Sequence, residues 1–187
     1  RCFLGGLNGV DLGFAVVASD REFLRDKLGF LRNTLGSHPG ITESEFVRDA
    51  LETFTERMEK RCLAAGELAE FLSSSQKVEK VYHLSLNDHR HYVFSEKLTR
   101  KTGVTLSLLL DGDTERSLNF RKRLKIFKRR ENRFMMGSTF FHPASEIYSS
   151  VPPEIRQELG ISEGLFQLQV GLENTRELID DLKQALS

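Results

Sequence analysis

The fold of this 187-residue chain is decided by residues 142–186, HPASEIYSSVPPEIRQELGISEGLFQLQVGLENTRELIDDLKQAL. Pro152-Pro153-Glu154 opens a short helix, because proline suits the first turn of a helix, and a glycine ends it. Residues 165–172 alternate like a half-buried strand. Asn174 or Thr175 then caps a closing helix. A short helix, a strand and a closing helix in this order indicate an α/β protein.

Composition narrows the class of protein without naming an activity. Hydrophobic residues make up 39% and charged residues 29% of the chain, which is typical of a globular domain and argues against a disordered chain. Lys and Arg together number 27, as do Asp and Glu, so no net charge draws the whole molecule to nucleic acid or to an anionic membrane. The length suits one domain, or one domain and a piece of another.

Cysteine usage and the chain's start give two further expectations. Cys2 and Cys62 have no paired spacing and no secretory segment precedes them, which predicts a reducing, cytoplasmic compartment. No apolar run approaches the roughly 18 residues that a membrane helix needs, so no membrane partner is expected. The chain starts with Arg1 rather than Met, and we expect it to be a fragment or a processed product.

The segments before residue 142 add strands and long helices. Residues 13–19, GFAVVAS, predict a buried strand. Asp20 is expected to cap a helix over 21–35, and Thr42 with Glu45 forms a capping box for a long helix over 43–73. Residues 78–84 and 104–110 predict strands, and 114–127 predicts a helix. Long helices and few strands predict an α/β sandwich, with helices packed on one side of a small sheet.

Two clusters of polar residues admit a functional interpretation, which we weigh against a structural one. His83, His89 and His91 share a predicted loop, but no Cys or carboxylate stands at zinc spacing, so polar loop histidines are favoured and no metal is expected. Residues 121–133, RKRLKIFKRRENR, hold eight basic residues and one acidic residue. A nucleic-acid or acidic-lipid patch is the alternative to a solvated helix face, which is favoured because no aromatic stacking residues are interleaved.

Three stretches resemble one known family. They are residues 57–82 with RME, AEFL and VEKVY, residues 124–145 from LKIF to HPAS, and residues 152–173 from PPE through LGI to VGLE. This pattern is similar to the pyridoxal-phosphate-dependent transsulfuration enzymes: cystathionine synthases and lyases, methionine lyase and O-acetylhomoserine sulfhydrylase. The resemblance covers the whole chain and corresponds to about the second half of such an enzyme.

The resemblance implies the C-terminal part of the aspartate-aminotransferase-type fold (fold type I), with helices packed on a small, mainly antiparallel sheet. Residues 1–42 then correspond to the last strand and helix of the large cofactor domain, 43–75 to a long bridging helix, and 76–187 to the C-terminal small domain. It also implies pyridoxal phosphate as cofactor and a homo- or hetero-oligomer with active sites between subunits.

Family chemistry needs a lysine to hold the cofactor and an arginine to clamp the substrate carboxylate with both oxygens. Residues 164–171, GLFQLQVG, match the family strand that carries this arginine and put Gln167 in its place. Losing such a charge-assisted pair costs on the order of 2–5 kcal/mol of binding. The resemblance therefore implies that an ordinary amino-acid substrate binds poorly.

Other positions depart from the family in the same direction. Aligning Phe3-Leu4-Gly5-Gly6 with the residues after the family lysine puts Cys2 at the lysine position. The alternative is that the lysine lies upstream. Phe134-Met135 replaces a glycine pair ahead of Ser138, which the resemblance places near the cofactor lysine, and Asp49-Ala50-Leu51 replaces arginine-glycine-leucine.

These departures favour a degenerate, non-catalytic homologue that works through a partner chain, either a family member or an upstream cofactor-binding half. The alternative is an active carbon–sulfur lyase or γ-replacement enzyme of altered specificity, whose lysine is supplied outside this fragment. A third reading is an adaptor that binds nucleic acid or membrane through residues 121–133.

Overall fold

The computed structural model describes residues 13–112, 114–129 and 137–187. The chain divides into two compact units, Arg1–Thr55 and Glu56–Ser187, and each is considered by itself. None of the described helices is long and apolar enough to cross a membrane.

The first unit contains α2 (Glu22–Thr34) and α3 (Ile41–Glu52). The predicted strand over 13–19 is wrong for the part that the structure describes: residues 13–18 form no regular element, and Val16 is 97% exposed. A strand needs a neighbour for its backbone N–H and C=O groups, and the described residues of this unit supply none.

Helix boundaries in the first unit differ from the expected ones. Arg21 precedes α2 without a side-chain cap, so Asp20 does not have the predicted role. Gly40 precedes α3, and Thr42 lies inside the helix, where it cannot form the predicted capping box. The expected single helix over 43–73 is interrupted at Thr53, beyond which α4 (Phe54–Ser73) begins. The Thr53 hydroxyl donates to the carbonyl of Ala50, a local bond that competes with regular helix pairing.

A five-stranded sheet forms the second unit's framework. The strands are β1 (Val78–Tyr82), β2 (Thr105–Leu110), β3 (Lys128–Arg129), β4 (Thr139–Phe141) and β5 (Leu165–Gln169). Their spatial order is β1-β2-β5-β4-β3, and every pair except β3 with β4 is antiparallel. This confirms the predicted α/β class with a mainly antiparallel sheet. The strand that carries Gln167 lies at the centre.

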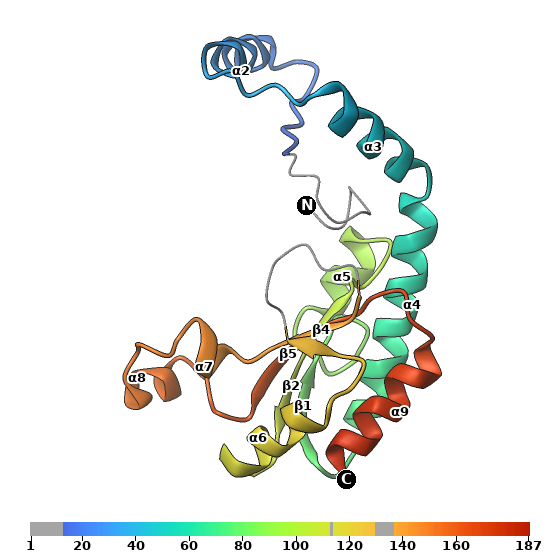
Figure 1. Cartoon of the computed structure of the whole chain (residues 1–187), viewed down its shortest axis with the longest axis vertical. Helices are drawn as coiled ribbons and strands as arrows, with labels where there is room; N and C mark the ends of the chain where they lie inside the picture. Colours follow the sequence, from blue (N-terminus) through green and yellow to red (C-terminus); the bar gives the residue numbers. More distant parts are fainter. Residues whose placement is uncertain (1–12, 113, 130–136) are drawn as a thin grey trace. The chain divides into compact units, whose positions relative to one another are not determined.

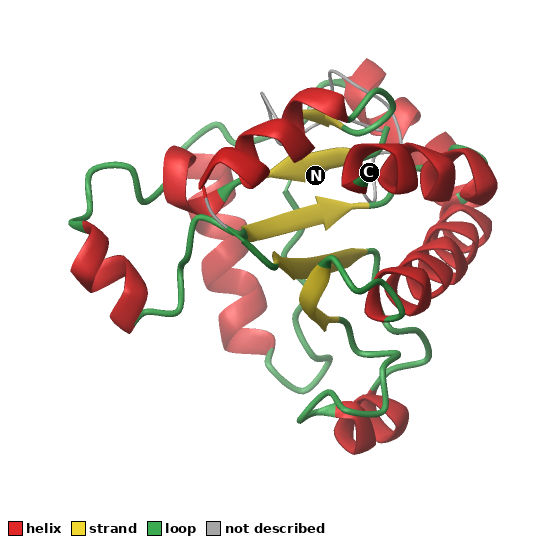
Figure 2. Cartoon of the chain, turned by 90° about the horizontal axis from the view of Figure 1, so that it is seen from below, coloured by secondary structure: helices red, strands yellow, loops and turns green. Residues whose placement is uncertain are grey.

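Helices α4, α6 (Thr114–Arg123) and α9 (Thr175–Leu186) contribute to one core with the sheet (Figures 1 and 2). The fully buried side chains in this core include Ala65, Leu68, Leu72, Leu106, Leu108, Phe166, Leu168, Leu178 and Leu182. Arg61 of α4 ties the helix layer to the sheet, because its Nε donates to the backbone oxygen of Val170 at 2.7 Å. These three helices pack on one face of the sheet, and the opposite face has other neighbours.

Shorter helices complete the unit: α5 (Tyr92–Leu98), α7 (Pro143–Glu146) and α8 (Pro153–Glu158). The expected proline start of α8 is confirmed, and Gly160, at φ 71°, follows its end. Asn174 caps α9 as predicted, accepting a hydrogen bond from the Arg176 N–H at 2.9 Å. Helix α6 ends at Arg123 rather than at the predicted residue 127, because the next segment bonds to α9 instead.

Candidate functional site around Gln167

Gln167 lies on the face of the sheet opposite the helical core. Along β5, Phe166 and Leu168 are buried, whereas Leu165, Gln167 and Gln169 are half-buried. Successive side chains of a strand point to opposite faces, so these three share the face that the helices leave uncovered. We call this the open face.

Register identifies the neighbours of Gln167. It is directly opposite Ser107 of β2 and Phe141 of β4, and Ser107 in turn is opposite Tyr82 of β1. Directly opposite residues in antiparallel strands share a face and interact through their side chains. Gln167 is thus flanked by a hydroxyl group on one side and an aromatic ring on the other.

Among the described residues of β1, β2, β4 and β5, none on the open face is an arginine. Lys80 is the one cation that these four strands place there, and its Nζ lies 5.3 Å from the centre of the Tyr82 ring. The Gln167 amide can donate hydrogen bonds to a carboxylate, but it brings no charge. Gln167 therefore binds a carboxylate more weakly than an arginine at the same position would.

Ser138 forms three hydrogen bonds with Glu173 and Gly171. Its hydroxyl donates to Glu173 Oε2 at 2.8 Å and accepts from the Gly171 N–H at 2.9 Å, while its own N–H donates to Glu173 Oε1 at 2.7 Å. Ser138 is 1% exposed. These bonds join the start of β4 to the turn after β5 and use the hydroxyl proton, so the visible role of Ser138 is to fix the backbone at this end of the sheet.

Gly171 is required by the close approach of the two segments. A Cβ added there would lie 2.6 Å from the backbone N of Ser138 and 2.7 Å from the carbonyl carbon of Gly137. Sequence reasoning named Gly171 and Glu173 as part of the family pattern but missed this pairing. The partners are 33 and 35 residues apart, and no short-range spacing indicates them.

A second set of contacts, also missed from sequence, positions the other end of β5. The buried His142 ring lies 4.8 Å from that of Phe166, its Nε2 donates to the Glu163 carbonyl at 2.8 Å, and its Nδ1 is 2.7 Å from Ser145 Oγ. Arg156 of α8 contacts Glu163 Oε1 at 3.1 Å. Both ends of the strand that carries Gln167 are therefore anchored.

The remaining candidate positions are less informative. Cys2 and Phe134-Met135 lie outside the described residues. Asp49 is exposed on α3 beside Arg48, and Ala50 is buried. His83 is buried in hydrogen-bonding contact with Ser85 and with the carbonyl of Gly103. In the described part of the chain, no group of three or more His, Cys, Asp or Glu residues could hold a metal ion.

Comparison with known proteins identifies the family of this chain. Residues 2–187 match the model of the Cys/Met metabolism PLP-dependent enzymes. The chain belongs to this family. The resemblance inferred from the sequence is thus confirmed, together with the fold type, and the family is one of pyridoxal-phosphate-dependent enzymes.

Individual relatives show how much of a family member is present. The chain is 35% identical to a cystathionine beta-lyase of Lactococcus lactis subsp. cremoris, covering 98% of this chain and 48% of that protein. It is 33% identical to an L-methionine gamma-lyase of Fusobacterium nucleatum subsp. nucleatum and 33% identical to a cystathionine gamma-lyase of Bos taurus, covering 98% of this chain in each case and 46% and 45% of those proteins. The chain spans about half the length of the curated relatives it matches.

The residues that the sequence predicts for the site do not fit the family's cofactor chemistry. That chemistry needs a lysine amine for the cofactor and a cationic fork for the substrate. The sequence resemblance predicts that these positions hold Cys2, which lies outside the described residues, and Gln167. The described strands β1, β2, β4 and β5 supply no arginine to the open face, and their one lysine there, Lys80, is packed against Tyr82. We derive no reaction step through pyridoxal phosphate from these residues.

Proposed function

We propose that this chain is a degenerate, non-catalytic member of the family, which keeps the small-domain framework and acts through association with a partner chain. The observation that carries the proposal is Gln167: β5 is anchored at both ends, yet the residue presented on the open face is a neutral amide. A framework kept without its charged group is typical of a protein retained for assembly rather than for chemistry.

The size of the loss supports this choice. A charge-assisted bidentate pair contributes about 2–5 kcal/mol, which corresponds to a loss of roughly 30-fold to several thousand-fold in affinity for an α-carboxylate. Ser107 and Phe141, the neighbours of Gln167, supply no compensating charge. Amino-acid substrates such as those of the lyase relatives would therefore bind this face weakly.

Surface composition supports association with a partner. Helix α2 has no buried residue, and its apolar side chains Phe23 and Phe30 are 79% and 67% exposed. Large apolar side chains exposed along one helix mark an interaction surface. The partner would be a cytoplasmic family member or a cofactor-binding half, with residues 1–42 belonging to the large domain, 43–75 bridging, and 76–187 forming the small domain.

Cofactor trapping tests the absence of catalysis. The protein is mixed with pyridoxal phosphate, treated with borohydride and digested, and the peptides are weighed. We expect no lysine carrying the reduced cofactor, and no release of ammonia and a keto acid from cystathionine, cysteine or homocysteine. A specifically labelled lysine together with such release would instead establish the active lyase, the alternative reading.

The role of position 167 is tested separately by Gln167→Arg. If Gln167 is only one of several losses, the substitution produces neither saturable amino-acid binding nor turnover. Gln169→Arg is the matched control, since it adds the same charge to the same face of β5, two residues away. Turnover in Gln167→Arg alone would show that the rest of the site survives and would refute the non-catalytic assignment.

A further inference from the structure

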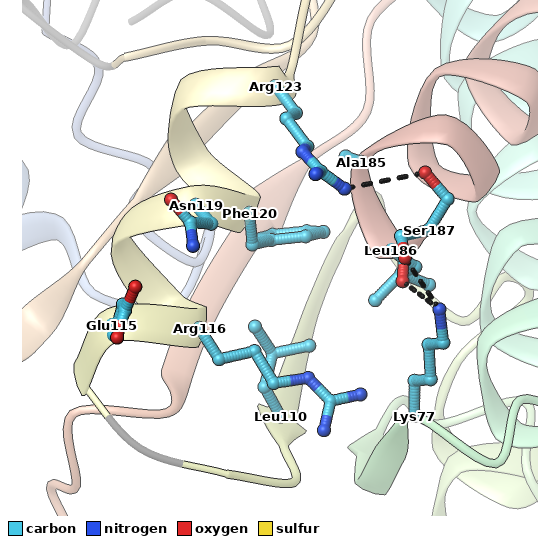
Figure 3. Close-up of a pocket in the computed structure, with 10 residues that line it drawn as sticks. All are labelled: Lys77, Leu110, Glu115, Arg116, Asn119, Phe120, Arg123, Ala185, Leu186 and Ser187. Carbon is cyan, nitrogen blue, oxygen red and sulfur yellow. Dashed lines mark hydrogen bonds between the residues drawn. The ribbon is translucent and has the colours of Figure 1, made fainter.

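A pocket lies on the helical side of the sheet, between α6 and the end of α9. Its volume is about 390 Å³, within the range of small-molecule sites. One wall is a single face of α6, formed by Arg116, Asn119, Phe120 and Arg123 at helical spacing. Figure 3 shows Arg116, Phe120 and Arg123 extending from α6 toward α9. Leu110 of β2, Lys77 and residues 185–187 complete the lining.

The lining carries an excess of positive charge. The lining has three basic side chains, Lys77, Arg116 and Arg123. It has one acidic side chain, Glu115, which lies on the side of α6 turned away from α9 (Figure 3). Arg123 Nη1 is 3.4 Å from the neutral hydroxyl of Ser187, and Arg116 Nη1 is 3.8 Å from the exposed Asp111 carboxylate. Lys77 donates to the backbone oxygens of Leu186 at 2.7 Å and Ser187 at 2.9 Å. Arg116 and Arg123 both line the pocket from α6, and an incoming anion would compete with the Asp111 carboxylate for Arg116.

The base of the pocket is apolar and fixed. Phe120, Leu110 and Ala185 line it and are almost completely buried. The Phe120 ring packs edge-on against Phe166 of β5, with 5.1 Å between ring centres. These side chains are already fixed by the core, so a compact hydrophobic group that contacts them meets a surface that does not need to rearrange.

We propose that this pocket binds a small organic anion, with its carboxylate or phosphate held by Arg116 and Arg123 and its apolar group placed over Phe120 and Leu110. Guanidinium groups bond both oxygens of such anions and keep their charge at every physiological pH. The pocket and Gln167 belong to opposite sides of the sheet, since Leu110 and Phe120 belong to the helical core. The proposal therefore concerns a second site, independent of the open face.

Isothermal titration of the 187-residue chain tests this site with four probes. 4-Phenylbutyrate and phenyl phosphate carry both an anion and a ring, 4-phenylbutanol lacks the charge, and inorganic phosphate lacks the ring. We expect the two aromatic anions to bind at least about tenfold more tightly than the alcohol or inorganic phosphate. The tighter of the aromatic anions identifies the preferred head group. Equal binding of the alcohol, or no binding of either aromatic anion, would overturn the proposal.

Variants place the binding on α6. Arg116→Gln and Arg123→Gln should each weaken binding of the preferred aromatic anion about tenfold, because each removes one charged donor. Lys122→Gln is the control, since it removes the same charge from the same helix outside the pocket lining. Circular dichroism and the thermal midpoint verify that each variant is folded. An equal loss in all three variants would indicate non-specific attraction to a basic surface and would contradict a defined site.

Discussion

At the scale of the residue, the proposed function depends on position 167, where the resemblance predicts an arginine and the chain has the amide of Gln167. The strand around it is that of the family, with Phe166 and Leu168 in the core and Gly171 in close contact with Ser138. We propose that the side chain of Gln167 on the open face is the part that differs from the family. A fold tolerates this exchange because Gln167 is not part of the core.

His83 gives a residue-scale prediction about pH. Burial lowers the pKa of His83 below its ordinary value of 6.5, an effect that the Gly103 carbonyl partly opposes and that nearby His89 adds to. Its side chain is 3% exposed, and Nδ1 accepts the Ser85 N–H, so a proton there would face another donor. The unfolded state therefore binds a proton at higher pH than the folded state does. Stability from His83 is complete above about pH 6.5 and is lost as the pH falls below that value.

Urea unfolding of the wild-type chain and of His83→Gln, between about pH 7.5 and pH 5.5, measures this effect. The wild type should lose unfolding free energy over this range by at most about 1.4 kcal/mol per pH unit, and the difference between the two proteins should shrink as the pH falls. His38→Gln, at an exposed position of the first unit, is the control and should keep the wild-type profile. Parallel profiles for the wild type and His83→Gln would contradict the assignment.

Residue-level prediction from the sequence succeeded where a pattern was local and failed where partners are distant. Asn174 was recognised as a cap because its partner lies two residues away. The bonds of Ser138 with Glu173, and of His142 with Glu163, join residues 35 and 21 positions apart. No periodicity connects them, and only the folded sheet brings them together.

At the scale of the element, the end of α6 shows how a tertiary contact overrides a helical pattern. Leu118, Leu124 and Phe127 continue an apolar stripe beyond Arg123, which is why the sequence predicts a longer helix. The buried Asp181 carboxylate of α9 accepts the N–H groups of Lys125, Ile126 and Phe127 at 2.8, 2.8 and 3.1 Å. These N–H groups would otherwise continue the helix. The segment therefore turns away and is fixed to α9.

Asp181→Asn tests this contact. An asparagine of the same shape offers one acceptor oxygen and an NH₂ donor to three backbone donors, so we expect a loss of about 3 kcal/mol of unfolding free energy. Chemical denaturation measures the loss. Asp180→Asn, at the exposed neighbouring position, is the control and should change stability by less than about 0.5 kcal/mol. A loss in Asp181→Asn as small as that of the control would show that the carboxylate does not hold the segment.

Residues 13–19 illustrate the opposite limit of sequence reasoning about elements. The run GFAVVAS has the composition of a buried parallel strand, but a strand forms only beside a neighbour. The described residues of the first unit are helical or irregular, and none pairs with it. The sequence shows that this run is apolar. Whether the run forms a strand depends on which chain segments lie next to it.

At the scale of the whole molecule, the exposed apolar residues of α2 give a prediction about assembly. Replacing both Phe23 and Phe30 with glutamine removes two rings from the surface without disfavouring the helix. Each buried Phe contributes about 1.5–3 kcal/mol, so the double variant should weaken association at least about tenfold. Sedimentation velocity over a range of protein concentrations measures this, with wild type as reference.

The control for this experiment is the double variant Glu22→Gln with Arg32→Gln, which changes two exposed polar residues of the same helix and should associate like the wild type. Circular dichroism confirms equal helix content in all three proteins. If the phenylalanine variant sediments as the wild type does, α2 is not the association surface, and the partner-dependent role loses its main support.

The order of the strands also has a consequence for synthesis on the ribosome. β5 comes last in sequence among the five described strands, yet it is paired between β2 and β4, so the centre of this sheet is filled last. At about 5–20 residues per second, β2 emerges several seconds before the strand that will cover its edge. During that interval a growing chain exposes unpaired backbone and the apolar side chains of β2. Production of this protein is therefore expected to depend on chaperones that protect strand edges, and slowing translation would lengthen the vulnerable period.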